Sequence, residues 1–156
     1  MVVFREMNET EYTSWRELAV KEYADDLAKA GYDTREHAPE SSAKEFDSIL
    51  SKGPKSEGVH LCVVMDEQSQ QRVGTILYTE KGGRRTDAIF IADIRVDEQC
   101  RGKGYGAAAL RLLEVKAREL GKNRIGLHVF AHNARAKKLY EKLGYSPVGI
   151  MMAKDL

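Results

Sequence analysis

Residues 101–106, with the sequence RGKGYG, hold three glycines and two cations. They separate an apolar stretch, residues 88–96, from a helical pattern over residues 108–120. A helix leaves its first four backbone N–H groups without partners, and its dipole makes that end positive. Glycines let a ligand approach these groups closely, and Arg101 and Lys103 add charge-assisted contacts. The segment predicts a cradle for a phosphate group, with a plain glycine-rich turn as the alternative.

The spacing of the glycines narrows the choice of ligand. No Lys-Ser or Lys-Thr pair follows at the spacing of a Walker A loop, which disfavours that kind of nucleotide site. Gly104, Gly106 and Ala109 match the G-x-G-x-x-A pattern of dinucleotide-binding folds. Such folds also place an acidic residue at the end of the next strand, where this chain has Ala-His-Asn at residues 131–133. A nucleotide-binding oxidoreductase therefore stays only as an alternative.

The periodicity of the chain predicts the elements that must position this segment. Strands are expected over residues 2–7, 59–67, 71–80, 88–96, 124–132 and 145–154, and helices over residues 8–31, 41–53, 108–120 and 134–144. Asn8 or Thr10 can cap the first helix and Gly31 can end it. Residues 67–71 and 81–87 are expected to be hairpin connections. Antiparallel strands followed by strand–helix–strand–helix–strand predict an α/β fold with a mixed sheet, in one domain over residues 1–156.

Composition excludes several classes of function. The chain has 25 Lys and Arg against 24 Asp and Glu, which disfavours a nucleic-acid partner held by phosphate charge. No apolar run approaches a membrane span, and the N-terminus lacks the long apolar segment of a signal peptide. Cys62 and Cys100 form no metal or redox motif, and no third ligand accompanies His128 and His132. We expect a cytoplasmic protein with no metal, no membrane contact and no nucleic-acid partner.

Two motifs resemble the GNAT superfamily of N-acetyltransferases. Residues 101–106 resemble the R/Q-x-x-G-x-G/A loop of that family, and residues 132–145, HNARAKKLYEKLGY, resemble its N-x-x-A-x-x-L-Y-E-K-x-G-F/Y segment. The resemblance is specific over residues 89–145, whereas over residues 1–80 only the order of elements fits. It implies the GNAT acyl-CoA N-acyltransferase fold, with acetyl-CoA as the co-substrate.

The resemblance also assigns residues to acetyl-CoA. It implies that the loop binds the pyrophosphate through its cations and through backbone N–H groups from Lys103 to Ala107. The loop residues are Arg101, Gly102, Lys103, Gly104, Tyr105, Gly106 and Ala107. The pantetheine arm is expected beside Ile94 and Val96 like an added strand, with a backbone N–H near Val96 polarising the thioester carbonyl. Asn133 is expected to contact the coenzyme, to cap the following helix, or to do both.

Tyr140 is the candidate acid. On the last predicted helix, Ala136, Leu139, Tyr140 and Leu143 follow the spacing i, i+3, i+4 and i+7, which places Tyr140 on the buried face. By spacing alone it is a core tyrosine, whereas the family resemblance makes it the acid that protonates the departing coenzyme A thiolate. With unperturbed pKa values this proton transfer is uphill by about 2 kcal/mol.

Asp93 is the candidate base. A lysine-like acceptor amine must lose a proton, which costs about 4–5 kcal/mol at pH 7, so a base is expected. Many members of the family place Glu on the strand before the loop, where this chain has Ala92. Strict alternation puts the neighbouring Asp93 on the face of Ile91 and Arg95. Asp93 is then either the base or the partner of Arg95 in an ion pair, and both alternatives stay open.

The first predicted helix carries Tyr23, Asp25 and Asp26. In the family that it resembles, the first helices wall the acceptor site, where acidic residues suit a cationic amine. A solvated helix face is the alternative, and Tyr23 and Asp26 are our candidates for binding. The prediction is an N-acetyltransferase that acetylates a primary amine of a small molecule or peptide directly, with a homodimer possible at the level of the family. A non-catalytic acyl-CoA sensor is the second alternative.

Overall fold

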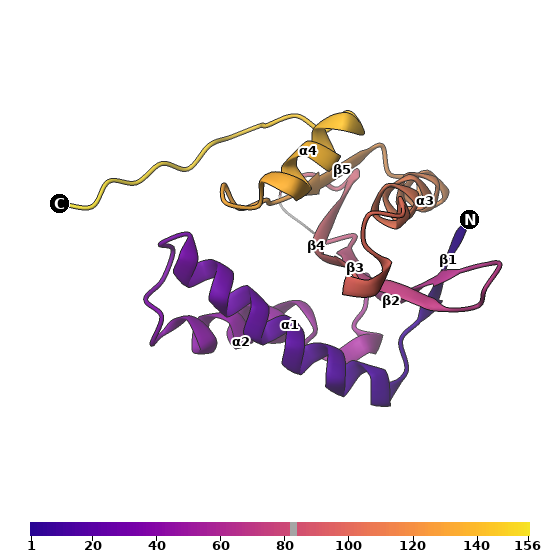
Figure 1. The fold of residues 1–156 in the computed structure, drawn as a ribbon, viewed down its shortest axis with the longest axis horizontal. Helices are drawn as coiled ribbons and strands as arrows, with labels where there is room; N and C mark the ends of the chain where they lie inside the picture. Colours follow the sequence, from indigo (N-terminus) through magenta and orange to yellow (C-terminus); the bar gives the residue numbers. More distant parts are fainter. Residues whose placement is uncertain (82–83) are drawn as a thin grey trace.

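The computed structural model describes residues 1–81 and 84–156, and Figure 1 follows them from the N-terminus to the C-terminus. The strands are β1 (Val2–Glu6), β2 (Val59–Asp66), β3 (Arg72–Thr79), β4 (Ala88–Val96) and β5 (Arg124–Leu127). The helices are α1 (Glu9–Lys29), α2 (Ala38–Ile49), α3 (Tyr105–Glu119) and α4 (Ala134–Lys142), with the short 3-10 helices η1 (Gly53–Lys55) and η2 (Glu98–Cys100). Residues 82–83, within the predicted connection 81–87, lie outside the described residues.

The strands form one mixed sheet in the order β1-β2-β3-β4-β5. The first four strands are antiparallel neighbours, which the sequence predicts for β2, β3 and β4. β5 runs parallel to β4, and α3 makes the crossover between them. The prediction of an α/β fold with a mixed sheet is therefore confirmed.

Helices cover both faces of this sheet. Leu110 and Leu113 of α3 pack on Ile76 of β3 and Ile89 of β4 in one core cluster. A second cluster, on the opposite face, joins α1 and α2 to β2 and β3 through Trp15, Phe46, Val63 and Leu77. Figure 1 shows α1 and α2 side by side, with the sheet between them and α3. Alternate residues of β2 and β3 therefore belong to different cores, as expected for a sheet buried on both sides.

Local signals set the start of the first helix. The Asn8 side chain accepts the N–H of Glu11 at 2.8 Å, and the Glu11 carboxylate accepts the N–H of Asn8 at 3.0 Å. This capping box confirms Asn8 as the cap. α2 begins at Ala38, before the predicted residue 41, because Pro39 suits the first turn of a helix.

Two predictions about the C-terminal third are wrong. β5 ends at Leu127, and residues 128–132 continue without forming a strand. The strand predicted over residues 145–154 is absent from the described sheet, and Figure 1 shows this segment leaving the body of the molecule. A strand needs a neighbouring strand for its backbone hydrogen bonds. The composition of residues 145–154 is therefore not enough to make them form a strand.

Candidate active site

The glycine segment forms a turn that leads directly into α3. Gly102 and Gly104 have φ angles of +76° and +85°, which residues with a side chain rarely adopt. Gly104 is the N-cap of α3, and no side chain caps this end. A Cβ atom placed on either glycine meets nothing within 4 Å, so the space in front of them is open. An uncapped helix N-terminus facing open space is suited to an anion.

Tyr105, the first residue of α3, is hydrogen-bonded to the end of β2. Its Oη donates a hydrogen bond to Asp66 Oδ2 at 2.6 Å, which raises the pKa of Tyr105. Asp66 Oδ1 also accepts the N–H of Gln68 at 2.8 Å. The Tyr105 side chain therefore fixes the helix end against the β2–β3 turn. Only its backbone N–H is left for the ligand contact predicted at this residue.

Arg101 connects the glycine segment to the end of β4. Its Nε donates to the carbonyl oxygen of Val96 at 3.2 Å, while Arg101 and Lys103 both stay exposed. Two cations thus stand beside the open end of α3. Their place favours a negatively charged ligand that passes from α3 towards β4.

β4 has an open edge next to this loop. It pairs with β5 only over Ala88–Ile91, and beyond that point no described strand follows its β5 side. The Asp97 N–H donates to the Val73 carbonyl at 2.9 Å, which fixes the hydrogen-bonding phase of the β3–β4 ladder. In such a ladder the N–H and C=O groups of Ile94 and Val96 point away from β3. The predicted place for the pantetheine arm is therefore a strand edge with available backbone groups.

A β-bulge in β4 sets the direction of the candidate base. Leu77 pairs with Asp93 but Tyr78 pairs with Ile91, so Ala92 is an extra residue in β4. Ile91 packs in the core under α3, whereas Ala92 packs in the core under α1 and α2. Asp93 shares the face of its partner Leu77, which lies in the α1–α2 core. The predicted strict alternation is wrong here, since Ala92 and Asp93 face the same side.

The Asp93 carboxyl group is buried close to the charges of Arg95 and Glu22. Its Oδ2 atom is buried and has no hydrogen-bond partner among the described residues, although the residue as a whole keeps some exposure. Burial raises the pKa of Asp93 to about 6, against the lowering effect of the nearby Arg95 charge. Arg95 itself pairs with Glu22, with Nη2 and Oε2 2.7 Å apart. The direct ion pair between Asp93 and Arg95 is therefore not formed.

Tyr140 lies on α4 close enough to Asp93 for their charges to interact. Its helix face, with Ala136, Leu139 and Leu143, is the less exposed one, as predicted. The pKa of Tyr140 is raised, first by burial and then by the negative charge of Asp93. The structure thus brings the predicted acid and the predicted base into one region.

Asn133 is the N-cap of α4. Its Oδ1 accepts the N–H of Ala136 at 3.2 Å, which confirms the capping alternative. The side chain remains exposed at the start of the helix. A contact between Asn133 and a coenzyme stays a prediction.

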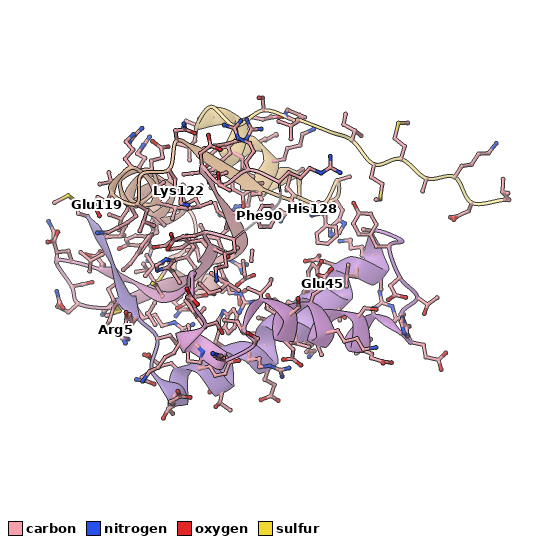
Figure 2. All side chains as sticks on the ribbon, turned by 180° about the vertical axis from the view of Figure 1, so that it is seen from behind. Arg5, Glu45, Phe90, Glu119, Lys122 and His128 are labelled. Atoms are coloured by element: carbon pink, nitrogen blue, oxygen red, sulfur yellow. The ribbon has the colours of Figure 1, made fainter. Side chains whose placement is uncertain are left out.

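A cavity of about 420 Å³ lies between the helices α1 and α2 and the segment after β5. Its lining combines aromatic rings with acidic groups: Tyr23, Leu27, Tyr32, Asp33, Ser41, Glu45 and His128. Figure 2 labels Glu45 on the helix side of this region and His128 on the sheet side. Of the two residues predicted to bind the acceptor, Tyr23 lines the cavity.

Asp26, the other predicted residue, belongs to a pair next to the cavity. Its Oδ1 lies 2.7 Å from His132 Nε2, and the His132 ring stacks on Phe130 at 5.4 Å. Phe130 in turn packs on the Tyr23 ring, with their centroids 5.9 Å apart. Asp26 therefore positions the wall that Tyr23 contacts, and it is not among the lining residues.

Several residues of this wall were not predicted from the sequence. Tyr32 Oη and His128 Nε2 lie 3.1 Å apart, and the His128 ring packs edge-on against Phe130 at 4.8 Å. His128, Phe130 and His132 alternate along the chain, which is the one signal that could have indicated a shared face. Nothing local in the sequence connects them to Tyr32 or Glu45.

The cavity carries negative charge beside its aromatic rings. Asp33 accepts a hydrogen bond from Ser41 Oγ, and its Oδ2 lies 2.9 Å from His37 Nδ1. These bonds lower the pKa of Asp33 and keep it ionised. Burial and the neighbouring Glu45 raise the pKa of Tyr23. Carboxylates and aromatic faces together suit a cation.

Other reactive groups of the chain do not join this region. Cys62 and Cys100 are free and buried, and burial raises the pKa of the Cys62 thiol to about 11. Across residues 1–81 and 84–156, no three His, Cys, Asp or Glu side chains gather in a way that could hold a metal ion. None of the helices in these two ranges has the length and apolar character needed to cross a membrane.

Comparisons of the sequence with known families and proteins give consistent matches. A sequence profile described as the acetyltransferase (GNAT) family matches residues 8–145. The uncharacterised N-acetyltransferase YdgE of Bacillus subtilis (strain 168) is 33% identical over 151 residues, covering 97% of this chain and 96% of YdgE. The uncharacterised N-acetyltransferase YycN of the same organism is 32% identical over 155 residues, covering 99% of both chains.

Solved structures agree with these matches. The crystal structure of YycN from Bacillus subtilis superposes with a TM-score of 0.93 at 32% identity, over 100% of this chain and 99% of that one. The structure of AAC(6')-Iy, in complex with the bisubstrate analogue CoA-S-monomethyl-acetylneamine, has a TM-score of 0.62 at 14% identity and covers 100% and 98% of the two chains. That second likeness concerns the fold alone.

Proposed function

Because this chain belongs to the acetyltransferase (GNAT) family, we propose that it transfers an acetyl group from acetyl-CoA directly to a primary amine. The observation that carries the proposal is the open edge of β4 at Ile94 and Val96. This edge leads from the glycine segment at the start of α3 towards Asp93 and Tyr140. In this proposal the donor, the base and the acid act in one region of the molecule.

The glycine segment fits the pyrophosphate of acetyl-CoA. Gly102 and Gly104 leave the uncapped start of α3 open, and Arg101 and Lys103 supply two cations beside it. The pantetheine arm then has the free N–H and C=O groups of Ile94 and the free N–H of Val96 as its partners. When bound, acetyl-CoA supplies the acetyl group as a thioester. The shared fold of AAC(6')-Iy, which holds a CoA bisubstrate analogue, supports this assignment.

Asp93 is the base in this proposal. With a pKa of about 6, its carboxylate is ionised at neutral pH and still accepts a proton more readily than an ordinary aspartate. The acceptor amine enters as an ammonium ion and loses one proton to Asp93. The neutral nitrogen attacks the thioester carbonyl, so that the C–N bond forms and the C–S bond breaks. The nitrogen then loses its second proton, which replaces the proton that Tyr140 gives to the departing thiolate.

Tyr140 is the acid. Burial is the larger cause of its raised pKa, and the charge of Asp93 adds to it. Once Asp93 has taken the proton of the amine, its charge is gone and the pKa of Tyr140 falls. Tyr140 therefore becomes the better proton donor at the stage when the thiolate leaves. Protonation of Asp93 therefore lowers the free-energy cost of proton transfer from Tyr140 to the thiolate, and no further residue is required.

The acceptor binds in the aromatic cavity between α1, α2 and the segment after β5. Tyr23, Tyr32 and His128 provide ring faces, while Asp33 and Glu45 provide negative charge. These groups favour an acceptor that carries positive charge near its reactive amine. Asp26 contributes through the His132–Phe130 stack that supports this wall.

A thiol-release assay tests the proposed function. The purified protein is mixed with acetyl-CoA and, one at a time, with a simple monoamine, a diamine, an aminoglycoside and a lysine-containing peptide. We expect acetyl-CoA to be consumed in step with formation of an acetylated amine. A neutral amide in place of the amine serves as the control. Tight binding of acetyl-CoA without turnover on any amine would contradict the proposal and favour the sensor alternative.

A further inference from the structure

Three buried polar atoms lie in the core between α1 and the sheet without a hydrogen-bond partner among the described residues. They are Trp15 Nε1 on α1, Thr75 Oγ1 on β3 and Asp93 Oδ2 on β4. Trp15 is 3% exposed and Thr75 0%. Buried polar side chains in folded proteins nearly always have a hydrogen-bond partner, so three such atoms in one core need an explanation.

The strand register brings Thr75 and Asp93 to the same side of the sheet. Thr75 lies opposite Val63 of β2, and Asp93 lies opposite Leu77 of β3. Val63 and Leu77 both pack in the core under α1 and α2, so Thr75 and Asp93 face this core as well. Because Thr75 pairs with Arg95, it stands one diagonal step from Asp93, a separation of about 7–8 Å between the backbones.

Trp15 covers this place from the helix side. Its ring packs in the same core as Leu77 and lies edge-on to Phe46, with the centroids 5.7 Å apart. Burial dominates the pKa of Asp93, and the indole N–H of Trp15 lies near enough to oppose that effect. Nevertheless, neither Trp15 Nε1 nor Asp93 Oδ2 has a hydrogen-bond partner. Two polar groups that face each other without a direct bond are commonly joined by a water molecule.

The three atoms together offer the partners that a buried water needs. The indole N–H only donates, an ionised carboxylate only accepts, and a hydroxyl group does both. A water that accepts from Trp15 and donates to Asp93 still has a position for Thr75, which gives it about three hydrogen bonds, the usual number for a buried water. A direct bond between any two of the atoms leaves the third unpaired, whereas one water satisfies all three.

We propose that one buried water molecule bridges Trp15, Thr75 and Asp93, and that Trp15 and Thr75 act through it as positioning residues for the base. The water holds Oδ2 of Asp93 in the core, and Oδ1 takes the proton of the acceptor amine. The positioning role rests on the proposed function, because it requires Asp93 to be the base. The water site itself does not depend on that function.

The charged and titratable groups around Asp93 come from the elements packed on it. Arg95 of β4 and Glu22 of α1 pair with each other and act on the pKa of Asp93 in opposite directions. Tyr140 of α4 lies close enough for its charge to interact with that of Asp93. The facing side chains of β3 are uncharged, and α2 meets this core through Phe46. The indole and the hydroxyl are therefore neutral groups that can be removed without changing the net charge of the site.

The first experiment looks for the water in the wild-type chain. In a crystal structure at high resolution, we expect one ordered water within hydrogen-bonding distance of Trp15 Nε1, Thr75 Oγ1 and Asp93 Oδ2. In NMR spectra of the same chain, the indole N–H of Trp15 should show a cross-peak to a long-lived water. A direct bond from the indole N–H to the carboxylate in the crystal structure would overturn the proposal, as would a dry space between the three atoms.

The second experiment follows the titration of the Asp93 carboxyl carbon by NMR, in the full chain without substrates. Trp15→Phe keeps an aromatic ring but removes the N–H, and Thr75→Val keeps the shape but removes the hydroxyl. Trp15→Phe should raise the midpoint by about 1 pH unit, because the ionised carboxylate loses the support of a donor, and Thr75→Val should raise it by about half as much. Unchanged midpoints in both variants would overturn the proposal.

Phe46→Leu and Thr79→Val are the matched controls. Phe46→Leu trims a ring of the same core without removing a polar atom, and the Thr79 hydroxyl has its own partner, the Gly58 carbonyl at 3.2 Å. Both controls should lower the melting temperature and leave the Asp93 midpoint unchanged. An equal shift in the controls and in Trp15→Phe would show that packing explains the titration, and would overturn the proposal.

Kinetics separate the positioning role from the water site. With an amine that is acetylated, the decline of kcat at low pH should shift in Trp15→Phe by the same amount as the titration midpoint. A shifted midpoint with an unshifted kcat profile would support the water site and overturn the positioning role. If no amine is acetylated, the proposed function fails, while the crystal structure and the titration still decide the water site.

Discussion

The two sides of the active region are built from different parts of the chain. The proposed donor side, at the start of α3 and the edge of β4, presents backbone groups: the N–H groups after Gly104 and the free edge at Ile94 and Val96. The proposed acceptor side presents side chains, among them Tyr23, Tyr32 and His128, which come from separate segments.

This difference matches what each side has to recognise. A pyrophosphate and a pantetheine arm need N–H and C=O groups, which every residue has, provided that the backbone takes the right path. Glycines and a bulge supply that path. A particular amine needs specific rings and charges, which only side chains provide. The donor side can therefore stay constant within a family of enzymes while the acceptor side changes.

The largest effect is expected between the two sides, at Tyr140. Tyr140→Phe keeps the ring but removes the proton, so kcat should fall by about 10²–10⁴. The Kd of acetyl-CoA and the KM of the acceptor should stay close to the wild-type values. Steady-state kinetics and calorimetry measure these quantities. Tyr145→Phe is the control, because this neighbouring ring, 5.7 Å from Tyr140, also carries a hydroxyl. Equal turnover of the two variants would show that Tyr140 takes no part in the chemistry.

Asp93→Asn should have the next largest effect, with kcat at pH 7 lower by a factor of about 10². The wild-type kcat should decline as the pH drops through about 6, the pKa of Asp93, because the base is then protonated. The Asn variant should lack this decline. It should also recover activity at high pH, where the amine loses its proton to water. A pH profile of kcat for both proteins makes the measurement, and an unchanged profile would exclude Asp93 as the base.

The same variant should be more stable at neutral pH. Folding raises the pKa of Asp93 from 3.8 to about 6, so the folded state binds its proton more tightly than the unfolded state does. The free energy of unfolding therefore falls as the pH rises from about 3.8 to about 6. Above this pH range, the full loss of stability caused by the ionised Asp93 is present. Asn removes a cost of up to about 3 kcal/mol at pH 7. Melting curves test this, and a lower melting temperature would indicate a structural role for the carboxylate.

Gly104→Val should weaken the binding of acetyl-CoA and leave the acceptor side unchanged. A side chain at this position enters the open space before α3 and disturbs the N–H groups there, so the Kd of acetyl-CoA should rise about 10–100-fold. Gly121→Val is the matched control. Gly121 follows the other end of α3, has a φ of +70° against +85° for Gly104, and also has nothing within 4 Å of its Cβ position. Similar affinities for the two variants in calorimetry would show that backbone strain, and not the ligand site, explains the result.

The smallest effects should separate the two sides most directly. Tyr32→Phe removes the hydroxyl that meets His128, and Tyr105→Phe removes the one that donates to Asp66. Each loses one hydrogen bond, so changes of about 2–10-fold are expected. Tyr32→Phe should raise the KM of the acceptor, and Tyr105→Phe should raise the Kd of acetyl-CoA. If each variant changed both constants equally, the division into two sides would be wrong.

The sequence by itself determined the features that depend on a few neighbouring residues. The cap at Asn8, one of two caps predicted, the antiparallel strands β2 to β4, and the glycine turn into α3 all appear in the structure. The physical reason is that capping, backbone φ preference and apolar alternation act within one or two turns of chain. The family resemblance added the likeness of residues 132–145 to a catalytic segment, which spacing alone does not provide.

Only the tertiary structure decided the features that depend on distant segments. The bulge at Ala92, which turns Asp93 towards α1, is defined by the register of β3 against β4. The acceptor cavity joins Tyr32 to His128 through a contact across 96 positions of the chain. The C-terminal segment has the composition of a strand, yet it forms none in the described sheet. Its backbone needs a neighbouring strand, and no sequence pattern says whether one is within reach.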